Sequence, residues 1–281
     1  MKIEKVTGSF GGRATGLDVS KPLTVEQVET LEAALDDHGV LFFPHQPVLT
    51  AEEQLALAAQ FGTIETPPLL TKQSEHPQVL IVEFEKPKGS GADVWHQDGT
   101  HLEVPPKGTF LQAHVLPGFG GDTCFACMYS AYEALSSPMR DMLDGLSVLH
   151  STQALYSKTL SRGQYDPETA RIKPPVSHPL VTANPRSGRK RLFVNPLYAL
   201  QVEGISEGES RYLLNFLFDH LNQPEFQLRH HWSVGDIAYW DNMAVQHYAV
   251  ADYVERRRMQ RVTLVGEAPS AVGDDRGRKA A

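Results

Sequence analysis

Apolar side chains recur at helical spacing near the start of the chain. Over residues 24–38, one face collects apolar positions at intervals of three and four, which predicts an amphipathic helix. These positions are Val25, Val28, Leu31 and Leu35. Thr24 and Gln27 form a capping box that starts the helix, and Gly39 ends it.

Three further helices are predicted on the same grounds. They begin at Thr50, around Ser137-Pro138 and at Ser206. The first and the last open on capping boxes, with Glu53 and Glu209 as the partners. The middle helix is expected to turn four apolar side chains inward, namely Met139, Met142, Leu143 and Leu146.

Short segments rich in β-branched and aromatic residues occupy much of the remaining chain and predict strands. They are Val40–Phe43, Val79–Phe84, Thr109–Leu116, Thr123–Cys127, Arg191–Val194, Ile237–Trp240 and Arg261–Val265. Their irregular spacing disfavours alternating βαβ units. Short strands with a few helices laid outside are typical of a double-stranded β-helix, or jelly roll. We therefore predict a mainly β fold with flanking helices.

A chain of 281 residues is long enough for one large β-rich domain or two ordinary ones. We predict a single domain over residues 1–268. Residues 269–281 combine Gly, Ala and charge without periodicity, so a disordered tail is expected. The stretch 155–175 is long and shows no clear element, which predicts a lid over a pocket.

Composition narrows the possible partners. The net charge is −8, so no basic field would attract nucleic acid or an anionic membrane. The basic run 186–191 contains Ser-Gly between apolar segments, which favours a hairpin turn. No apolar run approaches the length of a membrane span or a signal-peptide core. Two cysteines and no leader predict a cytoplasmic protein, and a homo-oligomer stays open.

The two cysteines, Cys124 and Cys127, form a lone C-x-x-C. A closed zinc site would need four ligands, and no second pair exists. Since the segment is predicted to be a strand, residues three apart point to opposite faces. Two buried structural thiols are the favoured interpretation.

Two histidines and one carboxylate carry the strongest chemical signal. His96 and Asp98 form a His-x-Asp pair, and on a strand they would share one face. The pair alone is a weak signal. His247 follows a strand and a turn, so it could return as a third ligand. Two imidazoles and a carboxylate are the set that holds non-haem Fe(II) and leaves positions open for O2 and substrate.

The chain resembles the taurine dioxygenase group of Fe(II)/2-oxoglutarate-dependent oxygenases, which includes aryloxyalkanoate dioxygenases. The resemblance covers about Gly11 to Glu267. It rests on six segments in the family's order: VWHQDGTHLEVPP, GGDTCFACMYSAYEALS, LFVNPLY, GDIAYWDN, QHYAVADY and RRRMQRVTLVGE. It implies a jelly roll that binds Fe(II) through His96, Asp98 and His247, with 2-oxoglutarate as cosubstrate.

The resemblance also implies residues for the 2-oxoglutarate carboxylates. Thr123 follows the His-x-Asp pair at the family's distance, and an arginine after the last histidine grips the other carboxylate. The family usually has ten residues between this histidine and the arginine, which selects Arg258, whereas the pattern Arg-x-x-x-Arg selects Arg257 with Arg261. We prefer Arg257, because on a strand Arg257 and Arg261 share a face and Arg258 points away.

Arg261 would be a second cation in the site, which favours a small anionic substrate such as an aryloxy or other carboxylate, a sulfonate or a sulfate ester. Asn195 and Tyr198 are expected to line the substrate pocket. Taurine itself is disfavoured, because the positions that bind it in taurine dioxygenases hold Pro67, Leu70 and Ala92 here.

Two other classes stay open. One is a non-catalytic jelly-roll binding protein, and the other is a cupin-like metal-dependent hydrolase or isomerase. Neither consumes 2-oxoglutarate, so succinate formation separates both from the oxygenase.

Overall fold

The computed structural model describes residues 1–66, 76–85, 92–153 and 174–273. Several sequence-based expectations fall outside these ranges. They are the expectations for Pro67 and Leu70, nearly all of the expected lid at 155–175, and residues 274–281 of the expected tail.

Helix starts follow the capping signals in the sequence. The helices are α1 (Val25–His38), α2 (Ala51–Ala59), α3 (Met128–Glu133), α4 (Ser137–Leu143) and α6 (Glu207–His220), with a short 3-10 turn at Pro224–Phe226. Thr24, Thr50 and Ser206 each make the predicted capping box. The expectation for Met142 is wrong. Its side chain is 47% exposed, because α4 has only seven residues and turns Leu143 to the core instead.

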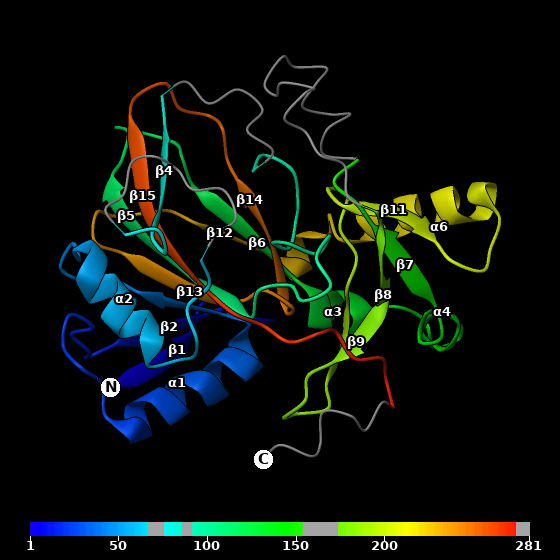
Figure 1. The fold of residues 1–281 in the computed structure, drawn as a ribbon, viewed down its shortest axis with the longest axis horizontal. Helices are drawn as coiled ribbons and strands as arrows, with labels where there is room; N and C mark the ends of the chain where they lie inside the picture. The colour runs from blue at the N-terminus through cyan, green and yellow to red at the C-terminus, as the bar shows by residue number, and fades with distance from the viewer. Residues whose placement is uncertain (67–75, 86–91, 154–173, 274–281) are drawn as a thin grey trace.

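The larger sheet has seven strands. Their spatial order is β1 (Lys2–Lys5), β2 (Gly12–Thr15), β3 (Val40–Phe43), β13 (Ile237–Asp241), β5 (Gly108–Val115), β15 (Arg257–Leu264) and β4 (Leu80–Phe84). All neighbours are antiparallel except β2 and β3. Sequence-distant strands alternate across it, since β13 lies between β3 and β5. Helices α1 and α2 cover one face of this sheet through a shared apolar cluster (Figure 1).

A smaller antiparallel sheet contains β12 (Gln227–His230), β6 (Thr123–Cys127) and β14 (Val245–Ala249). One buried cluster joins it to the larger sheet, with Phe125 and Val245 from one side and Leu111, Trp240 and Met259 from the other. Two sheets closed around one apolar interior form the jelly roll, so the predicted fold class is confirmed.

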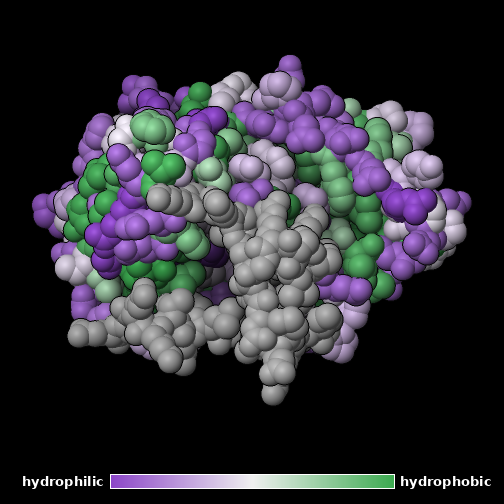
Figure 2. Space-filling model, turned by 90° about the horizontal axis from the view of Figure 1, so that it is seen from above, coloured by the Kyte–Doolittle hydropathy of each residue, from purple (hydrophilic) through white to green (hydrophobic). Residues whose placement is uncertain are grey.

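The other half of the molecule is built on short strands. They are β7 (Ser147–His150), β8 (Val176–Pro179), β9 (Val181–Ala183), β10 (Lys190–Leu192) and β11 (Ala199–Val202). A separate apolar cluster packs them against α3, α4 and α6 (Figure 1). The predicted hairpin at the basic run is confirmed, because β9 and β10 pair directly across residues 184–189. Seen from above, hydrophobic residues gather in a band toward the half that holds α6 (Figure 2).

One turn connects the two sheets of the jelly roll. The chain leaves β13 in the larger sheet, turns through Asp241–Ala244 and enters β14 in the smaller sheet. This crossing carries the chain from the larger sheet to His247 on β14.

Both cysteines are free thiols. Cys127 is buried as expected, and its sulfur accepts a hydrogen bond from the backbone N–H of Ser130 at the start of α3. Cys124 is only half-buried. Within the described ranges, no helix has the length and apolar character needed to cross a bilayer.

Candidate metal centre

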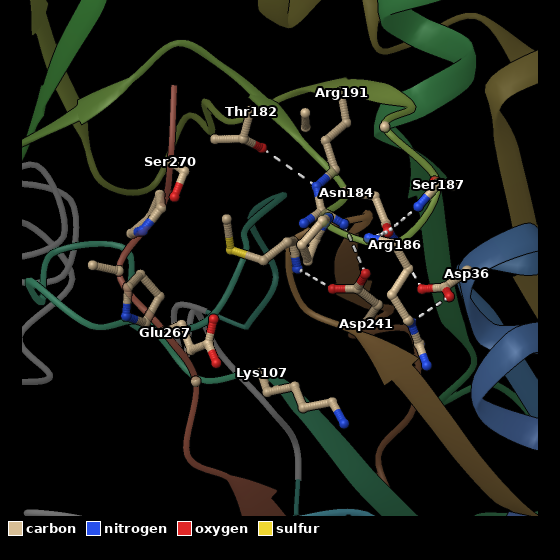
Figure 3. Close-up of a pocket in the computed structure, with 18 of the residues that line it drawn as sticks. Asp36, Lys107, Thr182, Asn184, Arg186, Ser187, Arg191, Asp241, Glu267 and Ser270 are labelled. Atoms are coloured by element: carbon tan, nitrogen blue, oxygen red, sulfur yellow. Dashed lines mark hydrogen bonds and ion pairs between the residues drawn. The ribbon is translucent and has the colours of Figure 1, made fainter. Parts of the chain in front are cut away.

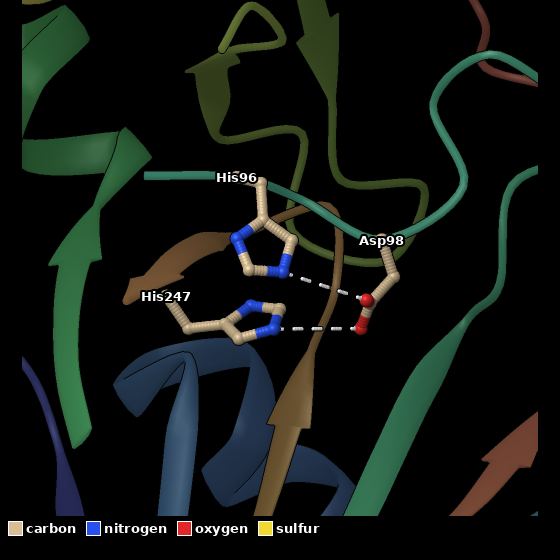
Figure 4. A group of neighbouring side chains, drawn as sticks. All are labelled: His96, Asp98 and His247. Carbon is tan, nitrogen blue, oxygen red and sulfur yellow. Dashed lines mark ion pairs between the residues drawn. The ribbon is translucent and has the colours of Figure 1, made fainter. Parts of the chain in front are cut away.

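Three side chains converge between β14 of the smaller sheet and β15 of the larger sheet. One ligand atom from each of His96, Asp98 and His247 can be chosen so that all three lie within 4.8 Å of one another. His96 Nε2 lies 3.9 Å from Asp98 Oδ1, and His247 Nε2 lies 3.7 Å from Asp98 Oδ2 (Figure 4). Both histidines are buried. The three residues proposed from the sequence are therefore brought together by the fold.

A single β-bridge joins the two histidines. His96 N–H donates to the carbonyl of His247 at 3.1 Å, and His247 N–H donates to the carbonyl of His96 at 2.8 Å. The His-x-Asp segment is not the regular strand considered from the sequence, because only His96 is bridged and Asp98 lies in a turn. The bridge and the turn therefore direct the side chains of His96 and Asp98 to the same point, and the alternation of side chains along a strand does not.

Asn242 holds the backbone of Asp98. Its Oδ1 accepts from Asp98 N–H at 2.7 Å, and its Nδ2 donates to the carbonyl of Asp98 at 2.9 Å. Gln97 adds a second link, since its Nε2 donates to the carbonyls of Asn242 and Met243. The sequence predicted only that a turn precedes His247. The structure shows that the same turn also fixes the carboxylate.

The donor set fits Fe(II). His96 Nδ1 lies 2.7 Å from the carbonyl of Val94, so it donates there and leaves Nε2 as the lone-pair nitrogen toward the site. Burial lowers the pKa of both His96 and His247, which favours the neutral imidazoles that a metal requires. Burial alone would raise the pKa of Asp98, but Arg261 and the two histidines outweigh it and lower the value to about 2. Two neutral imidazoles and one carboxylate are a set suited to Fe(II).

Thr123 is the first residue of β6 in the smaller sheet, and Arg257 is the first residue of β15 in the larger sheet. Thr123 is buried at the start of β6, and its Oγ1 accepts a hydrogen bond from Trp232 Nε1 at 3.0 Å. Arg257 is buried at the start of β15, and its Nε donates to the carbonyl of Gly121 at 2.9 Å. Its Nη2 is buried without a hydrogen-bond partner among the described residues. An unpaired buried guanidinium N–H is suited to receive a carboxylate.

Arg258 lies on the other face of β15. Its Nε is 3.8 Å from Glu83 Oε2, and its side chain is 37% exposed. Arg257 and Arg261 share the inner face with Met259, which packs in the cluster between the sheets. This placement favours Arg257 over Arg258, and the binding of 2-oxoglutarate by Arg257 stays a prediction.

Arg261 lies beside the three ligands. Its Nη2 donates to Asp98 Oδ2 at 2.6 Å, and its Nε donates to Thr263 Oγ1 at 3.3 Å. Arg261 is therefore a cation beside the three proposed ligands, and its contact with a substrate stays a prediction.

Asn195 and Tyr198 lie in a more enclosed position. Asn195 is fully buried, its Nδ2 donates to Thr100 Oγ1 at 3.1 Å, and its Oδ1 accepts from Tyr198 N–H at 3.0 Å. Tyr198 packs against His101 with ring centres 4.8 Å apart. These contacts connect both residues to the loop after Asp98. Their contact with substrate stays a prediction.

A cavity of about 640 Å³ lies away from the three ligands, and none of them lines it. It opens between α1, the β9–β10 turn and the segment after β15 (Figure 3). Its three cations are already neutralised: Arg191 by Asp241, Arg186 by Asp36, and Lys107 by Glu32. The cavity therefore offers no unpaired charge from these residues.

Known proteins are similar to this chain along most of its length. Residues 2–263 match the family model described as taurine catabolism dioxygenase TauD, TfdA family. An alpha-ketoglutarate-dependent sulfate ester dioxygenase of Pseudomonas putida is 33% identical, over 97% of this chain and 92% of that protein. An alpha-ketoglutarate-dependent 2,4-dichlorophenoxyacetate dioxygenase of Cupriavidus pinatubonensis is 33% identical, over 92% and 96%. The crystal structure of a taurine dioxygenase from Burkholderia xenovorans aligns with a TM-score of 0.83 and 31% identity, over 96% and 91%.

Proposed function

The chain belongs to the taurine catabolism dioxygenase TauD, TfdA family, and on that premise we propose that it hydroxylates a small anionic organic substrate. It is an Fe(II)- and 2-oxoglutarate-dependent dioxygenase, as its relatives are. The proposed substrate is a sulfate ester, a sulfonate, or an aryloxy or other carboxylate. The observation that carries this proposal is Arg261, whose guanidinium lies beside the ligand set.

We assign the metal to His96, Asp98 and His247. When bound, iron and 2-oxoglutarate supply the oxidation by O2, with release of succinate and CO2. The residues of the chain bind and orient the reactants. His96 Nδ1 is held by the carbonyl of Val94, so its ring cannot rotate freely. Asn242 fixes the turn that presents Asp98.

Arg257 and Thr123 are proposed to hold the two carboxylates of 2-oxoglutarate. The unpaired Nη2 of Arg257 supplies charge and direction. The hydroxyl of Thr123 already accepts a hydrogen bond from Trp232, so its own proton is left to donate to a carboxylate. Trp232 thereby orients the Thr123 hydroxyl, a role that the sequence did not suggest.

Arg261 is proposed to bind the anionic group of the substrate. Its guanidinium forms an ion pair with Asp98 Oδ2. A metal ion held by Asp98 would compete for this carboxylate and leave the guanidinium available to an anion. Asn195 and Tyr198 are proposed to shape the pocket from the loop side.

The proposed partners are the small-molecule substrate and O2, with no nucleic acid and no membrane. A cytoplasmic location is proposed because both cysteines are free thiols. A homo-oligomer is compatible with the proposal and does not enter the argument.

The first test is an anaerobic titration of the metal-free protein with Fe(II) and 2-oxoglutarate, followed through the weak visible charge-transfer band of the chelate. We expect the band in the wild type and in Asp37→Ala, a matched control because Asp37 is exposed on α1. We expect Asp98→Ala to abolish it. A panel of sulfonates, sulfate esters and aryloxy acids is then screened for succinate release.

An iron-loaded protein that shows no band and forms no succinate would contradict the oxygenase proposal. The binding-protein and hydrolase alternatives would then come first. If neutral analogues bind as well as the anions, the proposal of an anionic substrate is contradicted, and the oxygenase proposal is unaffected.

A further inference from the structure

A short extended segment at residues 63–65 pairs with the end of β15. Ile64 forms an antiparallel bridge with Leu264. Glu65 N–H donates to the carbonyl of Thr263 at 2.8 Å, and Val265 N–H donates to the carbonyl of Thr63 at 2.8 Å. Residues 63–65 therefore extend the larger sheet next to the strand that carries Arg261.

This register places the Glu65 side chain on the inner face. Ile64 and Leu264 both pack in the cluster under α1 and α2, on the outer face. Successive residues point to opposite faces, so Glu65 points inward together with its opposite neighbour Thr263. Arg261 is the diagonal neighbour of Glu65 on that face, a separation of roughly 7–8 Å that long side chains can span.

The charges around Glu65 agree with this position. Burial raises the pKa of Glu65, Arg261 opposes that rise, and Asp98 adds to it. Glu65 therefore interacts with Arg261, the cation proposed to bind the substrate, and with Asp98, a proposed metal ligand. Arg261 faces two carboxylates, and a metal ion would neutralise only the one on Asp98.

We propose that Glu65 determines which substrates this site accepts, by receiving an ammonium or other hydrogen-bond donor that lies beside the anionic group held by Arg261. The inference rests on the proposed function, because it takes Arg261 as the site of the anionic group. The substrate class becomes a carboxylate or sulfonate that also carries such a donor.

The reason is charge balance at the inner face. A lone anion bound to Arg261 would lie next to the Glu65 carboxylate, and like charges at that range repel in a partly desolvated site. An ammonium on the same molecule replaces the repulsion with an ion pair, and hydrogen bonds to charged groups are the strong ones. Arg261 and Glu65 together carry no net charge, which matches a zwitterion.

The test compares ligands that differ only in an amino group. One pair is 4-phenylbutanoate and 2-amino-4-phenylbutanoate, and the other is propane-1-sulfonate and 3-aminopropane-1-sulfonate. Dissociation constants are measured by calorimetry on protein loaded with Mn(II) and the inert cosubstrate analogue N-oxalylglycine. We expect the wild type to bind the amino member of at least one pair about tenfold more tightly.

Glu65→Gln should remove that preference, with tighter binding of the lone anion and weaker binding of the amino ligand. Glu29→Gln is the matched control, because Glu29 is exposed on α1, and it should keep the wild-type ratio. Equal ratios in wild type and Glu65→Gln, or no binding of any of the four ligands, would overturn the inference.

The two proposals fail in different ways. Loss of the proposed function appears as the absence of the Fe(II)–2-oxoglutarate band and of succinate in the wild type. An unchanged ligand ratio in a protein that shows the band and releases succinate removes the role of Glu65 and leaves the dioxygenase intact.

Discussion

Side chains along β15 alternate between its two faces, so its three arginines lie in different surroundings. Arg257 and Arg261 point between the sheets, and Arg258 points to the outer side toward Glu83. Arg257 is the one of these whose Nη2 is buried and unpaired within the described chain. A single step along the strand thus separates the guanidinium proposed to bind 2-oxoglutarate from one that lies beside Glu83 on the other face.

We expect Arg257→Lys to raise the KM for 2-oxoglutarate at least about tenfold, because a lysine cannot reproduce the planar fork that grips a carboxylate. Arg258→Lys should leave that KM within about twofold, since its ion pair with Glu83 is partly exposed. Initial rates of succinate formation at varied 2-oxoglutarate measure both. The opposite order of effects would assign the role to Arg258.

Asn242 is expected to control metal affinity through the backbone of Asp98. Asn242→Ala removes both hydrogen bonds to that residue and should weaken Fe(II) binding about 10- to 100-fold. Competition against a chromophoric chelator gives the affinity without any turnover. Asn222→Ala, at an exposed position, is the control. A variant with a lower Tm but unchanged Fe(II) affinity would reduce Asn242 to a structural role.

At the scale of elements, the loop before β6 forms the seat of Arg257, by which we mean the contacts of Gly121 that position the Arg257 side chain. Gly121 has φ +74, its N–H donates to Asp252 Oδ1 at 2.9 Å, and its carbonyl accepts from Arg257 Nε. Arg229 bridges Asp122 and Asp252 and so ties the loop to β12. The loop therefore aims the guanidinium as well as starting the strand that carries Thr123.

Gly121→Ala tests this seat. The added Cβ would lie 3.0 Å from Arg257 Cδ, and the backbone conformation there is strained for any other residue. We expect about tenfold weaker 2-oxoglutarate binding, read from the charge-transfer titration, with the iron affinity unchanged. Gly145→Ala has open space at its Cβ and should behave as wild type. Equal affinity for 2-oxoglutarate in both variants would argue against the seat.

Element boundaries show which local signals were sufficient. The side chains of Thr24, Thr50 and Ser206 each accept a hydrogen bond from the backbone N–H three residues later and so cap a helix. Those helix starts could therefore be predicted from the sequence. Strand β6 was predicted with its bounds, because β-rich residues lie between Asp122 and a helix start. The strands β1, β2, β7, β8, β9, β11, β12 and β14 were missed. They are short and irregular in polarity, and their partners rather than their composition make them strands.

At the scale of the whole molecule, buried histidines couple stability to pH. Burial is the main cause that lowers the pKa of His150 to about 3, and His178 and His101 add to it. The unfolded chain keeps a value near 6.5 and binds the proton first as the pH falls. The contribution of this residue to stability is therefore complete above about pH 6.5 and is lost as the pH drops toward 3.

We expect the free energy of unfolding of the metal-free protein to fall by about 2 kcal/mol from this residue between pH 6.5 and 5. Urea denaturation at several pH values measures the slope. His150→Gln should flatten the slope by that amount whatever its stability at pH 7. His45→Gln serves as the control, because His45 is exposed in the turn after β3. A slope identical in wild type and His150→Gln would refute the assignment.

The sequence by itself determined the local structure and the chemical types of the site. Capping residues and strand-forming runs depend on near neighbours, so they can be read from the chain. The pattern His-x-Asp with a later His named the ligand set, and the motif order named the family. None of these needs the distance between remote residues.

The tertiary structure alone decided how remote residues meet. The bridge between His96 and His247, the hold of Asn242 on Asp98, and the seat of Arg257 against Gly121 each join segments more than a hundred residues apart. Glu65 carries no local signal, and its place on the inner face follows from one register with β15. Sheet register is set by the packing of both faces at once, so no single segment encodes it.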